Sequence, residues 1–148
     1  MAKLVRAIQP YCKEEIVAAM PCTRGEADST GSDLFTRRAR EVASGVRPAG
    51  NFDSLPEYVF LALGTHSLYA FDYRPKLFGY EIKMQVACWP RNEVSVVAEC
   101  TATMAYFVIT KSSGESYALE ISAMSYPVGR SAVEFLSILG GSTRRTAR

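Results

Sequence analysis

Residues 57–74 read EYVFLALGTHSLYAFDYR, and this stretch decides the fold. Tyr58–Leu63 is an unbroken apolar run, whereas Leu68–Tyr73 alternates aromatic with smaller side chains, as strands of a sheet do. The four residues between them, GTHS, are mostly turn formers. The segment is therefore predicted to be a β-hairpin. His66, the only histidine of the chain, lies at its tip and is expected to be structural rather than catalytic.

Strand signals continue after this hairpin. The stretch 80–89, YEIKMQVACW, is the most regular of them, because apolar residues at alternate positions predict a strand with one dry face. Together with the hairpin, these segments predict six consecutive strands in a meander. The further strands are expected at Tyr80–Trp89, Val94–Cys100, Met104–Thr110 and Ser116–Ser122. The dry face of the first comprises Tyr80, Ile82, Met84, Val86 and Cys88.

Two turns in this region predict a strand register. A hairpin loop at 90–92 and another at 112–114, in which Gly114 supplies the left-handed conformation, both keep apolar residues opposite apolar residues. A slip of one residue would turn either hairpin inside out. The pairs that these loops predict are Cys88 with Val94, Val86 with Val96, Met84 with Ala98, Lys83 with Glu99, Ile109 with Tyr117, and Phe107 with Leu119.

The two ends of the chain differ from this pattern. Ser131 and Glu134 form a capping box for a C-terminal helix that ends at Gly140-Gly141, and the basic tail 142–148 is expected to be disordered. Near the N-terminus, residues 10–20 fit either a short strand or the end of a helix. Ser32–Val46 has helical spacing. Residues 1–141 are thus predicted to form one domain, with a partly helical insertion at about 22–57.

The order of these elements resembles the pleckstrin-homology-like (PH-like) proteins of bacteria. A first strand in EEIVAAMP (Glu14–Pro21) precedes the insertion, and the hairpin Leu61–Phe71, LALGTHSLYAF, is similar to the family signature Leu-Ala-Val-Thr-Asp-Arg-Arg-Leu-Leu-Val-Phe. The turn lacks the Asp-Arg-Arg of that signature, so no ligand role is carried over to it. The resemblance covers residues 14–140. It implies a mainly β (α+β) fold, with about seven antiparallel strands in two nearly orthogonal sheets and a C-terminal helix that caps the barrel.

Composition narrows the class of function. A formal charge of +2 gives no dense basic face for nucleic acid, and the four cysteines include no C-x-x-C pair for zinc. The chain offers no stretch long enough for a signal-peptide core or a membrane span. We therefore expect a cytoplasmic protein with free thiols and no metal or cofactor. A single histidine on a turn gives a hydrolase no base beside a nucleophile, so an enzyme is not predicted.

The residues that favour a binding role are mostly basic. Arginines gather in the insertion, where acidic residues leave only a small positive excess, and two more cations follow the second strand of the hairpin. They favour an acidic peptide or anionic lipid, while Trp89 at a strand end is expected to be an exposed anchor for a partner. The aromatic residues 69–80 are expected to fill the barrel.

The predicted function is a non-enzymatic module that binds another protein; the alternative is a carrier or sensor of a lipid or small ligand. The candidate binding residues are Arg37, Arg38, Arg40, Arg47, Arg74, Lys76 and Trp89.

Overall fold

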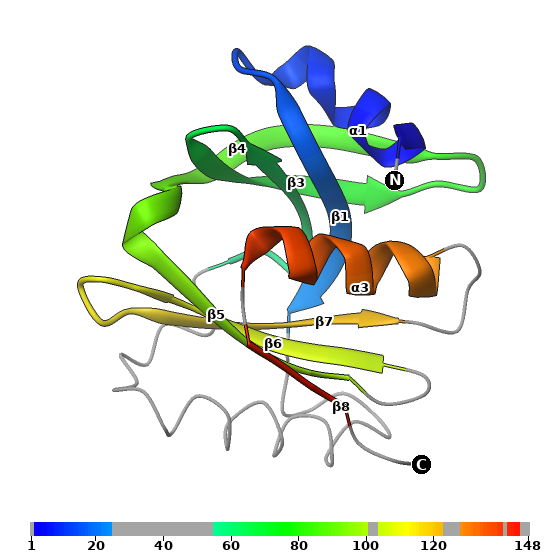
Figure 1. Cartoon of the computed structure of the whole chain (residues 1–148). Helices are drawn as coiled ribbons and strands as arrows, with labels where there is room; N and C mark the ends of the chain where they lie inside the picture. The colour runs from blue at the N-terminus through cyan, green and yellow to red at the C-terminus, as the bar shows by residue number, and fades with distance from the viewer. Residues whose placement is uncertain (1, 25–54, 101–103, 123–127, 141, 146–148) are drawn as a thin grey trace.

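The protein is represented by a computed structural model, which describes residues 2–24, 55–100, 104–122, 128–140 and 142–145. These residues are mainly β, with one α-helix near each end of the chain (Figure 1). In chain order the elements are α1 (Ala2–Ile8), the 3-10 turn η1 (Gln9–Tyr11), β1 (Ile16–Arg24), β2 (Tyr58–Gly64), β3 (Ser67–Pro75), β4 (Tyr80–Pro90), the 3-10 turn η2 (Arg91–Glu93), β5 (Val94–Cys100), β6 (Met104–Lys111), β7 (Ser116–Ser122), α3 (Val128–Leu139) and β8 (Ser142–Arg145).

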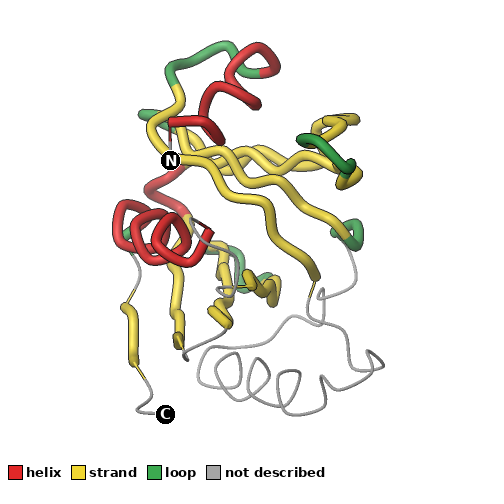
Figure 2. Tube along the Cα trace, turned by 90° about the vertical axis from the view of Figure 1, so that its right-hand side faces the viewer, coloured by secondary structure: helices red, strands yellow, loops and turns green. Residues whose placement is uncertain are grey.

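The strands form one sheet in the order β4-β3-β2-β1-β7-β6-β5-β8. Seven strands pair antiparallel, and β8 adds to β5 in parallel. Strand β1 joins two groups of strands, because it pairs along its length with β2 and only through Thr23 and Arg24 with β7. The sheet is bent, and α3 lies along one side between the two groups (Figures 1 and 2).

Two of the predicted hairpins are confirmed, β2–β3 and β6–β7. The turn Thr65–His66 joins β2 to β3, as the GTHS segment predicts. The register of β6 and β7 is also confirmed, since Ile109 pairs with Tyr117 and Phe107 with Leu119. The loop between them closes through Gly114, whose φ of 102° is a left-handed conformation that glycine adopts without a steric penalty.

The predicted hairpin between β4 and β5 is wrong. Strand β4 pairs with β3, and β5 pairs with β6 and β8, so the meander breaks at η2. Two backbone hydrogen bonds explain the break: Arg91 donates to the carbonyl of His66 at 2.9 Å, and Ser112 donates to the carbonyl of Glu93 at 2.8 Å. One end of η2 is thus held at the β2–β3 turn and the other at the β6–β7 turn. The predicted pairing of Lys83 with Glu99 does not form.

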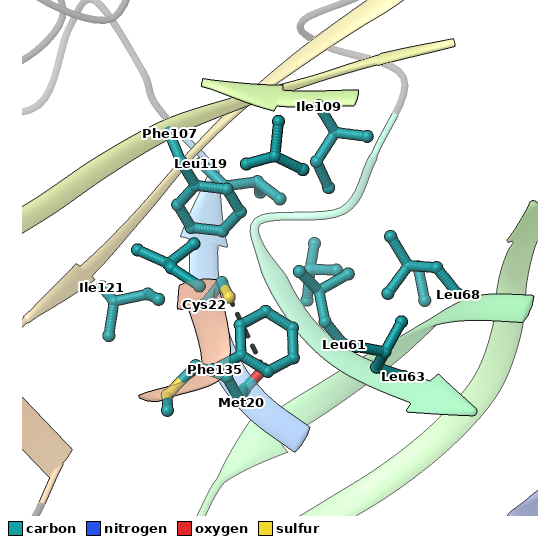
Figure 3. Packing of buried hydrophobic residues seen from close by; sticks show 14 of the residues in the cluster. Met20, Cys22, Leu61, Leu63, Leu68, Phe107, Ile109, Leu119, Ile121 and Phe135 are labelled. Atoms are coloured by element: carbon teal, nitrogen blue, oxygen red, sulfur yellow. Dashed lines mark hydrogen bonds between the residues drawn. The ribbon is translucent and has the colours of Figure 1, made fainter. Parts of the chain in front are cut away.

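The main apolar core lies between the two groups of strands. Leu61 and Leu63 from β2 and Phe107 from β6 belong to this core, and α3 adds Phe135, which lies close to Met20 of β1 (Figure 3). Since these side chains are buried, α3 holds both groups of strands through one shared core. Burial of this kind stabilises a fold by about 25 cal/mol for each Å² of apolar surface.

A second, smaller cluster lies on the other face of β1, β2 and β3. Phe60 and Ala62 of β2 point into it, whereas their neighbours Val59, Leu61 and Leu63 belong to the main core. Helix α1 covers this cluster with Ile8 and with Leu4 and Val5. Strand β2 is therefore buried on both faces, which explains why its sequence is an unbroken apolar run. The aromatic residues predicted to fill the barrel instead pack here or on the surface: Tyr69, Phe71, Tyr73 and Tyr80 belong to this cluster, and Phe78 is exposed.

Several boundaries differ from the sequence prediction. Residues 16–24 form a strand, which resolves the alternative left open for residues 10–20, but α1 was not predicted. Helix α3 begins at Val128, three residues before the predicted cap Ser131. Ser142–Arg145 form β8 where a disordered tail was predicted. The helix predicted at Ser32–Val46 lies outside the described residues.

Candidate interaction surface

Strand β4 is one edge of the sheet and carries exposed apolar side chains. Its inner side pairs with β3, and in the described part of the chain no strand pairs with its outer side. Met84 is 66% exposed and Val86 39% exposed, and Leu77 and Phe78 in the β3–β4 turn are 90% and 88% exposed. The hairpin that carries them ends at the right of Figure 1. An exposed apolar edge is an unusual feature in a monomeric protein, because it invites pairing with another strand.

The exposure of Met84 and Val86 corrects the predicted dry face of β4. The pairing with β3 shifts twice, once between Ala70 and Phe71 and once between Phe71 and Tyr73. Each shift is a bulge that interrupts the two-residue alternation of side chains. Tyr80 and Ile82, before the two shifts, pack in the cluster under α1, and Trp89, after them, packs in the main core on the opposite face. The middle of the strand, including Met84 and Val86, is left at the surface.

The β3–β4 turn adds charge to the apolar edge. Its backbone closes through the amide of Lys76, which donates to the carbonyl of Gly79 at 3.1 Å. Arg74 pairs across the sheet with Glu81, and the Glu81 carboxylate lies 3.6 Å from the ammonium of Lys83. Arg74 and Lys76, both predicted as binding residues, are therefore exposed next to Leu77 and Phe78.

The other predicted binding residues do not join this surface. Trp89 is only 6% exposed and stacks on Tyr117, with ring centroids 5.3 Å apart and an angle of 26° between the rings. Its predicted role as an exposed anchor is wrong, because Trp89 pairs with Leu68 of β3 and lies on the same face of the sheet, which packs against the main core. The remaining residues lie outside the described part of the chain: Arg37, Arg38, Arg40 and Arg47.

A polar cluster lies at the β2–β3 turn. One carboxylate oxygen of Glu14 accepts hydrogen bonds from the backbone N–H of His66 at 2.8 Å and from the hydroxyl of Thr65 at 3.0 Å. The other accepts the phenol of Tyr69 at 2.5 Å. A Cβ on Gly64 would lie 2.5 Å from the Glu14 carboxyl carbon, so this position suits only glycine while Glu14 stays in place. Glu14 therefore anchors the GTHS turn.

The electrostatics of this cluster favour a structural role over proton transfer. The hydrogen bond from Tyr69, followed by that from the His66 amide, lowers the pKa of Glu14 to about 2. The same bond raises the pKa of Tyr69 to about 12. Both groups therefore keep one protonation state near neutral pH, where a general acid or base needs to exchange its proton. Burial, followed by the nearby Glu14 charge, raises the pKa of the Cys12 thiol to about 11, which makes it a poor nucleophile.

The sequence did not predict the residues that form the apolar β4 edge or the carboxylate at the centre of the polar cluster. Leu77 and Phe78 had a local signal, since two large apolar residues in a short turn between charged residues are exposed for lack of room in the core. Met84 and Val86 had none, because their exposure depends on the bulges. Glu14 also had none, since its partners lie about 50 positions away in the chain.

The described residues contain no group of three histidine, cysteine, aspartate or glutamate side chains that could hold a metal ion. Within the same residues, no helix has the length and apolar character needed to cross a bilayer. No protein-family model matches the chain, and comparisons with curated proteins and with solved structures found no match.

Proposed function

We propose that the protein is a non-enzymatic module that binds another protein through the β4 edge. The observation that carries this proposal is the exposure of Met84 and Val86 on an edge strand. An extended segment of a partner can add to such an edge, because the main-chain groups supply hydrogen bonds and the exposed side chains supply apolar contact. Leu77 and Phe78 extend the apolar surface beyond the end of the strand.

The proposal includes the PH-like architecture. Two features support it. Strand β1 connects the group β4-β3-β2-β1 to the group containing β7, β6 and β5, and α3 packs on the core that the two groups share. In a two-sheet barrel of this kind the strands would be a rigid support for the binding edge. A bacterial, cytoplasmic setting belongs to the same proposal, and the free thiols of Cys12, Cys22 and Cys88 are compatible with a reducing compartment.

Two observations favour protein binding over the alternatives. Large side chains such as Phe107, Phe135 and Leu61 pack in the main core, which is where a carrier would hold a lipid or small ligand. The polar cluster around Glu14 has pKa values far from neutral, which weakens the case for an enzyme.

Affinity capture from the native cells tests the proposal. The chain is immobilised as wild type, as M84K/V86K and as V17K, and the bound proteins are identified and quantified by mass spectrometry. Charge on an edge strand blocks edge-to-edge pairing. V17K is a matched control, because Val17 is 37% exposed and Val86 is 39% exposed, and Val17 lies in β1 instead of the edge.

The expected result is a stoichiometric protein that wild type and V17K retain and that M84K/V86K loses. Capture that is equal for all three variants would overturn the role of the edge. A co-purifying lipid or metabolite in place of a protein would overturn the class of function.

A further inference from the structure

The charges on the β4 edge are self-complementary. Glu81 and Lys83 flank Ile82, and both charged side chains are substantially exposed. In an isologous dimer, two identical strands meet antiparallel about a two-fold axis. If that axis passes through Ile82, Glu81 of each copy lies opposite Lys83 of the other. Opposite charges directly across an antiparallel pair stabilise it, whereas like charges destabilise it.

Other positions of the axis match the charges less well. An axis through Lys83 would place the two lysines opposite each other. An axis through Met84 would place Lys83 opposite Gln85 and leave Glu81 without an opposite charge. Since only the axis through Ile82 pairs both charges, the sequence of the edge selects one register.

Apolar residues fit the same register. An axis through Ile82 places Met84, which is 66% exposed, opposite the half-buried Tyr80 of the second copy, and Ile82 opposite itself. The residues Tyr80–Ile82 also pair regularly with β3, whereas the bulges begin after Ile82. Lys83 and Met84 lie opposite the single residue Asp72 and form the first bulge, where the edge begins to twist away. The pairing about Ile82 is therefore short and ends at these two residues.

Resting on the proposed role of the β4 edge in protein binding, we propose that its partner is a second copy of this chain, paired antiparallel about Ile82. The dimer is weak and reversible, because few residues pair and the charged groups stay partly hydrated. The cross-strand ion pairs fix its register more than its affinity.

Charge exchange between copies tests this inference. Sedimentation velocity over a series of concentrations gives the dimer dissociation constant of wild type, E81K, K83E, the double variant E81K/K83E and an equal mixture of E81K with K83E. Each single variant puts like charges opposite at two places, which is expected to raise the dissociation constant about tenfold. The mixture and the double variant restore opposite charges across the axis and are expected to return near wild type.

The mixture separates pairing between copies from the ion pair within one chain. Neither variant in it has the internal Glu81–Lys83 pair, so a recovered dimer can come only from charges that meet across the interface. K111E is the matched control, because Lys111 forms a 2.8 Å ion pair with Glu115 in the β6–β7 hairpin. It is expected to leave the dissociation constant unchanged.

Two outcomes would overturn the inference: a chain that stays monomeric at every concentration, or a dimer that is indifferent to both single substitutions. The proposed binding function would survive either of them if M84K/V86K still loses a captured protein that V17K retains. The two proposals therefore fail independently.

Discussion

Glu14 and Tyr69 are 55 positions apart in the chain, and the Tyr69 phenol donates a hydrogen bond of 2.5 Å to the Glu14 carboxylate. This contact fastens the segment before β1 to β3, while the same carboxylate holds the β2–β3 turn through the amide of His66. The β2–β3 hairpin is thus held in place by a partly exposed carboxylate that comes from outside the hairpin.

E14Q is expected to be less stable than wild type by about 2 kcal/mol at pH 7, because hydrogen bonds to a charged group contribute more than those to a neutral amide. The folded-state pKa of Glu14 is about 2, below its ordinary value of 4.5. The unfolded state therefore binds more protons between these values, so the stabilisation is complete above pH 4.5 and is lost as the pH falls towards 2.

Urea unfolding of both proteins at pH 7 and pH 3 measures this effect. The stability difference is expected to shrink at the lower pH. E15Q is the control, since the neighbouring Glu15 is exposed. A difference that is independent of pH would contradict the charged role of Glu14.

Gly64→Ala is expected to destabilise the protein because the new Cβ would lie 2.5 Å from the Glu14 carboxyl carbon. The clash depends on the Glu14 side chain. In an E14A background the same substitution should therefore cost less. A double-mutant cycle by urea unfolding measures this coupling, and additive effects of the two substitutions would show that Gly64 is needed for another reason.

Trp89→Ala is expected to destabilise the protein by about 3–5 kcal/mol, as truncation of a buried aromatic residue does. Trp89 is 6% exposed and stacks on Tyr117, so its role is in the core. The loss is measured by circular dichroism in urea, with V17A as an exposed control. Because Trp89 is the only tryptophan, its fluorescence in wild type should also shift to longer wavelength on unfolding. Emission that is already water-like in the folded protein would contradict its burial.

The sequence predicts those parts of the fold that depend on local signals. The strands from Tyr58 to Ser122 end within two residues of their predicted ends, because side-chain alternation and turn residues act over short distances. The break between β4 and β5 depends instead on hydrogen bonds from η2 to two separate turns. The bulges of β4 likewise depend on the pairing with β3, so the exposure of Met84 could not be read from alternation alone. Trp89 is buried because its face of β4 packs against the main core, which the predicted meander did not place there.

The candidate surface was predictable only in part for the same reason. Arg74 and Lys76 are predicted from their positive charge, which favours an anionic partner, and both are exposed in the structure. The apolar residues Met84 and Val86 belong to β4, whose outer side the sequence predicts to be paired with the segment of β5. In the structure β5 pairs with β6 and β8 and not with β4, so the outer side of β4 is an edge and its charges are free to face a partner.

Glu120→Gln is expected to stabilise the protein at neutral and alkaline pH. Glu120 pairs with Thr23 where β1 meets β7, and its burial raises the pKa of the carboxyl group above the ordinary value of 4.5, although a hydrogen bond from Thr23 partly offsets this effect. The folded state therefore binds the proton more tightly than the unfolded state, so stability is highest below pH 4.5 and falls as the pH rises through the folded-state pKa. Glutamine keeps the shape and hydrogen-bonding capacity without the buried charge.

Urea unfolding at pH 4 and pH 8 measures this effect. E120Q should be more stable than wild type only at pH 8, and the control E134Q, on the exposed face of α3, should match wild type at both. If E120Q were less stable than wild type at pH 8, the ionised carboxylate would have to contribute a favourable contact at the β1–β7 junction that outweighs its burial.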